Sequence, residues 1–194
     1  MGFYKSTHNI IPKGLYNQST EEKSTIHLTI AYRHYSAALL SRILGQTIEE
    51  KIMNTVIGLE SLLLAENQEV SFRFWVRGAK ILSLLGYSPM RVKTLLKLAY
   101  DIRSSFVHGD DLELEKKLKK LNENQHNPNS FLLEILDYLR ALIVAMIFLS
   151  TNQDFVTNKK RIRYFEKKKF LDIVDNALID TGQESDLRKI LNFR

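Results

Sequence analysis

The chain has 194 residues, of which 44% are hydrophobic and 26% charged, and its formal net charge is +6. This length and composition fit one soluble domain with a substantial apolar core. The chain has no cysteine, which excludes disulfides, thiolate metal sites and a cysteine nucleophile and is typical of a cytoplasmic protein, while the positive charge favours polyanionic partners such as nucleic acid.

Helical periodicity dominates the chain and predicts an all-α fold with about five main helices. We expect the first 20 residues to form an irregular arm. The main helices should follow within residues 21–152, and a basic helical extension should occupy residues 153–194. The predicted main helices run over about residues 20–44, 47–65, 70–85, 89–108 and 130–150.

Capping residues support these boundaries. Thr47 with Glu50 three residues later makes a capping box at the start of the second helix. Pro89 begins the fourth helix, and Gly109 ends it as a left-handed cap.

Two segments outside the main helices carry weaker patterns. The charged stretch 110–129 predicts a short helix followed by a loop. The amphipathic stretch 170–179 predicts a last helix, and we expect Gly182 to break it before a terminal turn.

No membrane association is expected. The N-terminus is too polar for a signal peptide, and the most apolar run, residues 141–149, is far shorter than the ~20 residues that span a bilayer. This run predicts a helix that is buried on all sides.

The most informative feature is an arginine and a histidine, Arg103 and His108, near the end of the fourth predicted helix. A guanidinium is always charged and suits a phosphate, and an imidazole titrates near neutral pH. Together they supply what metal-free cleavage of a phosphodiester needs, namely charge stabilisation and proton transfer. They are the candidate catalytic residues.

Helical geometry separates the two side chains. At about 100° per residue, positions 103 and 108 lie about 140° apart on a regular helix. His108 shares its face with Lys93, Lys97 and Ser104, whereas Arg103 borders the apolar stripe. The pair converges only if the helix end distorts or if a second chain completes the site.

Both residues also have a purely structural interpretation. A histidine before a glycine is often a C-capping residue, and an arginine at the edge of a core often pairs with a carboxylate, here Asp101 or Glu60.

The segment from Leu98 to Gly109 resembles the signature of HEPN domains, and of the Apea-like HEPN family in particular, in which Arg is followed by four to six residues and then His. Residues 57–63 (Ile-Gly-Leu-Glu-Ser-Leu-Leu) resemble an upstream family helix. Residues 72–77 and 81–86 resemble the helix that follows it. The three blocks occur in the family's order, and together they cover about residues 25–150.

This resemblance implies a compact up-and-down helical bundle that forms a homodimer. It implies a metal-independent endoribonuclease in a bacterial toxin or anti-phage defence setting, with an antitoxin as a possible partner and no cofactor. His108 would move protons at the 2′-hydroxyl and the leaving oxygen, and Arg103 would stabilise the phosphate charge. Ser104 replaces the Asn, Asp or His that often follows the Arg. The alternative is therefore a non-catalytic HEPN module that binds RNA or protein, or a domain of a larger protein.

Four residues are candidates for binding single-stranded RNA. Ser104 offers a hydroxyl and Lys97 a charge on the face of His108. Arg73 and Arg77, with Lys80, form a helical stripe beside Phe74 and Trp75 that suits an RNA backbone. The alternative is that Arg73 and Arg77 pair with acidic groups such as Glu60 inside the bundle.

The stretch 159–169 holds seven Lys or Arg residues and two aromatic residues, a pattern that suits single-stranded nucleic acid and equally suits a solvated surface. The histidines at positions 8, 27, 34 and 126 lack metal-ligand spacing, so no metal site is predicted.

Overall fold

The computed structural model describes residues 21–66, 69–123, 127–151, 156–159 and 162–191. The described part is predominantly helical, which confirms the all-α class. The helices are α1 (Glu21–Leu44), α2 (Ile48–Leu63), α3 (Val70–Leu84), α4 (Pro89–His108), α5 (Asp111–Glu123), α6 (Pro128–Leu149), α7 (Lys167–Asn176) and α8 (Thr181–Ile190).

The predicted caps are present. The Thr47 side chain accepts a hydrogen bond from the Glu50 amide, and the Glu50 side chain accepts one from the Thr47 amide, so the capping box is confirmed. Pro89 stands in the first turn of α4, where its missing N–H costs no helical hydrogen bond. Gly109 adopts the left-handed conformation at φ 66°, which ends α4 at His108 as predicted.

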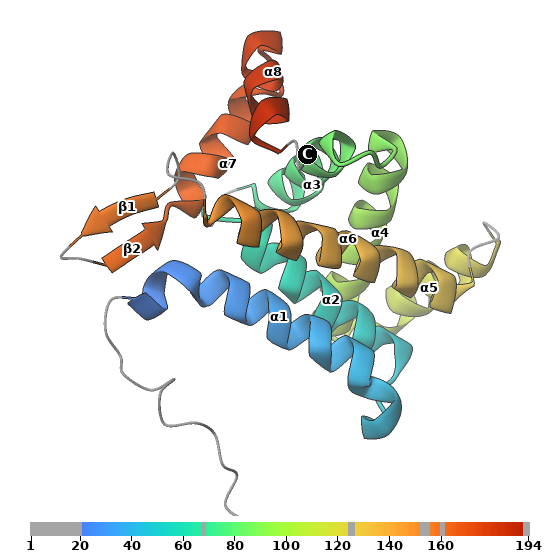
Figure 1. Ribbon diagram of the computed structural model, residues 1–194. Coiled ribbons are helices and arrows are strands. Elements are labelled where there is room, and N and C mark those ends of the chain that lie inside the picture. Colours follow the sequence, from blue (N-terminus) through green and yellow to red (C-terminus); the bar gives the residue numbers. More distant parts are fainter. Residues whose placement is uncertain (1–20, 67–68, 124–126, 152–155, 160–161, 192–194) are drawn as a thin grey trace, which may run out of the picture.

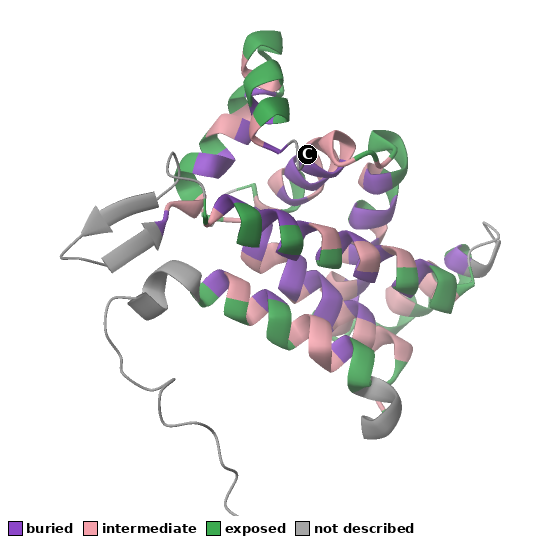
Figure 2. Ribbon diagram, viewed as in Figure 1, coloured by how far each residue is buried: buried purple, intermediate pink, exposed green. Residues whose placement is uncertain are grey.

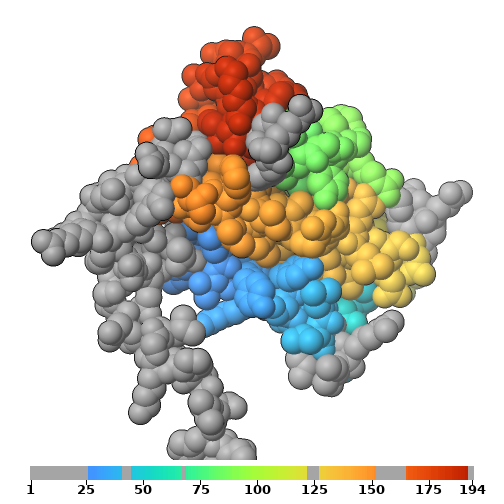
Figure 3. Space-filling view, viewed as in Figure 1, coloured from blue at the N-terminus to red at the C-terminus, as the bar shows by residue number. Residues whose placement is uncertain are grey.

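The helix α2 lies at the centre of the fold. It packs against α1 on one side and against α4 and α6 on others, while α3 packs along α4 (Figure 1). α5 follows α4 after a tight turn and also contacts α6. In the space-filling view α1 and α6 lie side by side and form one face of the molecule (Figure 3).

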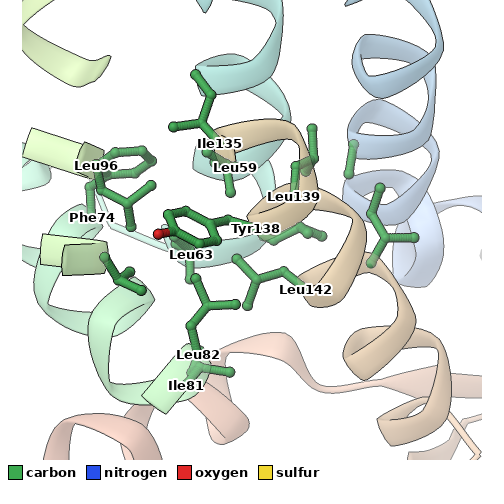
Figure 4. Close-up of a cluster of buried hydrophobic side chains, with 14 of the residues drawn as sticks. Leu59, Leu63, Phe74, Ile81, Leu82, Leu96, Ile135, Tyr138, Leu139 and Leu142 are labelled. Carbon is green, nitrogen blue, oxygen red and sulfur yellow. The ribbon is translucent and has the colours of Figure 1, made fainter. Parts of the chain in front are cut away.

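The core is built from the inner faces of these helices. Buried residues concentrate on α2 and on the inner side of α6 (Figure 2). Tyr138 of α6 packs among Leu63, Leu139 and Leu142 (Figure 4), and its hydroxyl leaves the apolar cluster by donating to Glu134 Oε1 at 2.7 Å. The run 141–149 is not buried on all sides, because Val144 and Ile147 are half exposed on the outer face of α6.

Close packing between α3 and α4 depends on one glycine. A Cβ at Gly78 would meet the Leu96 side chain well inside van der Waals contact and Leu63 Cδ1 at 3.3 Å. The absence of a side chain at position 78 therefore lets α3 approach both α4 and α2.

The C-terminal region departs from the prediction in two ways. Strands β1 (Val156–Lys159) and β2 (Ile162–Phe165) form an antiparallel hairpin in which Val156 pairs with Phe165 and Lys159 with Ile162. Gly182 does not break a helix. It lies in the first turn of α8, where its amide and that of Gln183 donate to the Asp180 side chain that caps the helix.

The predicted N-terminal arm, residues 1–20, and residues 160–161 of the basic stretch lie outside the described residues. None of the helices that the structure describes is long and apolar enough to cross a bilayer.

Candidate functional site

Arg103 is held between α4 and α2. Its Nη2 lies 3.5 Å from Oε2 of Glu60, and the side chains of both residues are only partly exposed, at 26% and 17%. Glu60 belongs to the block 57–63 that resembles a family helix, and Arg103 belongs to the segment 98–109 that resembles the HEPN signature. Two separate sequence blocks therefore meet at one ion pair, as the structural interpretation of Arg103 expected.

This contact engages few of the N–H donors of the Arg103 guanidinium. Within the described part of the chain it makes this ion pair and no hydrogen bond, and its buried Nε has no acceptor. A guanidinium has five N–H donors, so Arg103 keeps the capacity to bind an oxyanion.

Burial shapes the charges around the pair. It raises the pKa of the Glu60 carboxyl above its ordinary value, and the charge of Arg103 offsets part of that rise. Burial also raises the pKa of Tyr100, whose hydroxyl lies in the field of Glu60. Phe74 packs against the Tyr100 ring with 5.5 Å between centroids, which fixes the ring beside the pair.

His108 is exposed at the end of α4. Among the described residues, none forms a hydrogen bond or an ion pair with its ring. The backbone beyond it is fixed, because the Gly109 amide donates to Phe106 O at 3.3 Å and the Asp110 amide donates to Ser105 O at 3.0 Å. The imidazole is thus presented to solvent on a rigid helix end.

The structure does not bring Arg103 and His108 together within one chain. α4 continues as an α-helix through His108, so the distortion that would let the two side chains converge is not present. They remain about 140° apart around the helix axis.

Ser104 and Lys97 lie on the arc of α4 that also carries His108. Lys97 is exposed and Ser104 is partly buried. Nearby, Lys117 of α5 donates to the Asp101 carbonyl oxygen at 3.1 Å and to Ser105 Oγ at 2.6 Å. Lys117 therefore adds positive charge near the end of α4.

Arg77 does not line a surface stripe. Its side chain is fully buried, donates from Nε and Nη2 to Asp175 at 2.8 and 2.7 Å, and donates from Nη1 to Leu63 O and Glu66 Oε2. Burial lowers its pKa, but the bonds to Asp175 and Glu66 outweigh this effect and raise the pKa. Arg77 therefore cannot reach RNA. The pairing with acidic groups expected as the alternative is confirmed, and the partners are Asp175 and Glu66.

The remaining members of the predicted stripe are also used by the fold. Arg73 pairs with Asp175 at 3.3 Å and with Glu66 at 3.8 Å, and about a third of its side chain is exposed. Lys80 donates to Glu184 of α8 at 2.8 Å, and Phe74 is fully buried. Together these side chains attach α7 and α8 to α3.

Glu60 also lines a groove of about 390 Å³. It is lined by residues of α1, α2 and the start of α3, among them Ile30, Ile57, Glu60 and Val70. Close by, Lys167 donates to Ser61 O and Leu64 O at the end of α2, and burial lowers the pKa of Lys167. This lysine caps α2, and sequence patterns gave no signal for it beyond its place in a basic run.

Histidine 27 is buried next to this region. Burial, with the charge of Lys167 as a smaller cause, lowers the pKa of His27 to about 4, and its Nε2 has no hydrogen-bond partner among the residues that the structure describes. No group of three or more His, Cys, Asp or Glu within the described ranges could hold a metal ion.

Family models, curated proteins and solved structures were all compared with the chain, and none of them matches it.

Proposed function

We propose that this chain is a metal-independent endoribonuclease of HEPN type that works as a homodimer, with Arg103 and His108 acting on the RNA phosphodiester. The observation that carries the proposal is the unequal use of two arginines. Arg77 donates four hydrogen bonds to other residues of the fold, whereas Arg103 makes one ion pair and keeps free donor capacity, five residues before an exposed histidine. The bacterial toxin or anti-phage setting, with its antitoxin, rests on the family resemblance.

The proposed reaction is a transesterification within the RNA. The 2′-oxygen forms a bond to the adjacent phosphorus while the bond from phosphorus to the 5′-oxygen breaks, which leaves a cyclic phosphate and a 5′-hydroxyl. One imidazole takes the 2′-hydroxyl proton and a second, protonated one supplies a proton to the leaving oxygen. Two copies of His108 would provide both, and Arg103 would stabilise the charge on the pentacoordinate phosphorus.

The separation of the pair around α4 is the reason to propose a homodimer. Since one chain turns Arg103 and His108 in different directions, a phosphate that contacts both residues requires the second copy. Ser104, on the same arc of α4 as His108, could donate a hydrogen bond to the same phosphate.

The second candidate function is a non-catalytic HEPN module that binds RNA or protein. The pairing of Arg103 with Glu60 favours it, because the guanidinium already has a partner within the fold.

Single-stranded RNA incubated with the chain in EDTA separates the two functions. We expect cleavage to survive EDTA and to be lost in Arg103→Ala and His108→Ala. Arg91→Ala is the matched control, because Arg91 is an exposed arginine of the same helix that pairs with Glu134. Equal cleavage by all variants would indicate a contaminating nuclease, and RNA binding without cleavage would favour the module.

Mixing wild-type chains with the His108→Ala variant tests the dimer. If one site uses both copies of His108, a dimer with one altered chain should be inactive, so an excess of His108→Ala should suppress the activity of the wild type. A clean monomer by sizing chromatography would contradict the composite site.

A further inference from the structure

The outer surface of α3 and α4 carries aromatic and basic side chains that the proposed chemistry does not use. Phe72 of α3 is 54% exposed, and its ring meets Trp75 edge to face with 4.9 Å between centroids. Lys93 of α4 lies over the Trp75 ring, with its Nζ 4.9 Å from the centroid. Trp75 itself is partly buried against the core. An exposed aromatic ring braced by a second ring, with a cation held against that second ring, has the composition of a nucleic-acid stacking platform.

The basic side chains continue from this platform toward His108. At about 100° per residue, Lys93, Lys97, Ser104 and His108 fall within an arc of about 60° on α4. Lys97 is exposed, and no described carboxylate pairs with it. Asp101 borders this arc, and Lys117 bonds to its backbone oxygen at 3.1 Å, so positive side chains outnumber the acidic one.

We propose that Phe72, Trp75, Lys93 and Lys97 form a binding track that delivers single-stranded RNA to His108. A base stacks on the exposed Phe72 ring, and the two lysines contact the phosphates that follow. The distance along α4 from Lys93 to His108 is about 22 Å at 1.5 Å per residue, which fits the ~4–16 nucleotides that single-strand sites cover. The track rests on the proposed function for its endpoint, the cleavage site.

The occupant follows from chemistry on this surface. A duplex hides the faces of its bases, so an exposed aromatic ring gives it no stacking contact, whereas a single strand can offer both an unstacked base and a phosphate. The lysines would meet the negative backbone.

Trp75 makes the proposal directly measurable, because it is the only tryptophan of the chain. The His108→Ala chain in EDTA is titrated with a 15-nucleotide oligouridine, and the intrinsic fluorescence is followed. We expect saturable quenching. Phe72→Ala should weaken binding by roughly 5-fold or more through lost stacking. Log affinity falls as log salt rises, and Lys93→Gln and Lys97→Gln should each make this negative slope shallower by about 0.7.

Two surface substitutions serve as controls. Leu133→Ala removes an apolar side chain that is 64% exposed on α6, and Lys189→Gln removes an exposed lysine of α8. Both should leave the titration unchanged. A quench that Phe72→Ala and Lys93→Gln do not alter would overturn the track. So would an unchanged Trp75 signal, the result expected if a protein covers this face.

The titration does not depend on cleavage. If the RNA quenches Trp75 as expected but the wild-type chain does not cut it, the track stands and the proposed nuclease is wrong. If cleavage occurs but Phe72→Ala and Lys93→Gln bind normally, the nuclease stands and the track is wrong.

Discussion

Arg103 and Glu60 face each other from α4 and α2 with 3.5 Å between Nη2 and Oε2, and within the described residues this is the only ion pair of either side chain. The contact is long and leaves most of the guanidinium donors unused. The contact can orient the Arg103 guanidinium while its other donors stay free for another acceptor. This distinguishes Arg103 from Arg77, which donates four hydrogen bonds to Asp175, Glu66 and a backbone oxygen.

Glu60→Gln should separate orientation from stability. Burial raises the pKa of Glu60, so the folded state keeps this proton to a higher pH than the unfolded state, and stability falls as pH rises from the ordinary glutamate value through the raised one. The glutamine lacks this loss, so the urea midpoint at pH 7 should be equal or higher. If Glu60 positions Arg103 for the proposed reaction, EDTA-resistant cleavage should drop by about 10-fold or more.

A matched carboxylate checks that result. Glu134→Gln removes the partner of Arg91 at the other end of α4 and should leave cleavage unchanged. Unaltered cleavage in Glu60→Gln would mean that Arg103 needs no positioning by Glu60.

Arg77→Met should be strongly destabilising. It leaves the Asp175 and Glu66 carboxylates without their buried counter-charge, and breaking such a network costs about 3–5 kcal/mol of unfolding free energy. Urea denaturation followed by circular dichroism measures the loss. Lys80→Met, which breaks the more exposed pair with Glu184, should have a smaller effect.

The double variant Arg77→Met with Asp175→Leu tests the cause. If the uncompensated carboxylate is responsible, the double variant should be more stable than Arg77→Met alone. Additive losses would show instead that the packing volume of Arg77 matters more than its charge.

His27 should make the fold sensitive to acid. Its pKa in the folded state is about 4, against an ordinary value of 6.5, so below pH 6.5 the unfolded state binds the proton more readily. Stability is therefore lost as pH falls from about 6.5 to about 4, by on the order of 3 kcal/mol at most. In His27→Leu this loss should be absent, and urea midpoints at pH 7, 6, 5 and 4 should reveal it. Parallel profiles of the wild type and the variant would contradict the prediction.

Gly109→Ala should weaken the end of α4 through strain alone. The φ of Gly109 is +66°, and no atom lies within 4 Å of a Cβ built there. The left-handed conformation costs a residue with a side chain about 1–2 kcal/mol, and Asn tolerates it better than Ala. We expect the unfolding free energy to be highest for the wild type, lower for Gly109→Asn and lowest for Gly109→Ala. Amide exchange around His108 should be faster in Gly109→Ala. Equal stabilities of the Asn and Ala variants would point to another cause.

Sequence patterns predicted helix ends well where the capping groups lie within a few residues of each other. The Thr47–Glu50 box, Pro89 and Gly109 act within a few residues of the chain, and each marks a helix end that the structure has. The hairpin was missed because its basic residues suggested a solvated stretch. The β-branched and aromatic residues of 156–165 were the available signal.

Long-range partners could not be predicted in the same way. Arg77 and Asp175 are 98 residues apart, and neither sequence neighbourhood identifies the other. The spacing Arg73–Arg77–Lys80 correctly indicated one helix face, yet that face packs under α7 and α8 and is mostly covered by them. Asp180 as the cap of α8 was a local signal, but Gly182 was interpreted as a break.

The attachment of α7 has a practical consequence for shortening the chain. α7 contributes Phe170, Leu171 and Val174 to the apolar cluster of the helices that precede the hairpin. Its Asp175 balances the charge of Arg77, which is buried on α3. A fragment that stops at residue 152 would expose that cluster and leave a buried guanidinium without its main counter-ion. We therefore expect such a fragment to aggregate on expression, so assays of the α4 site need the chain through α8.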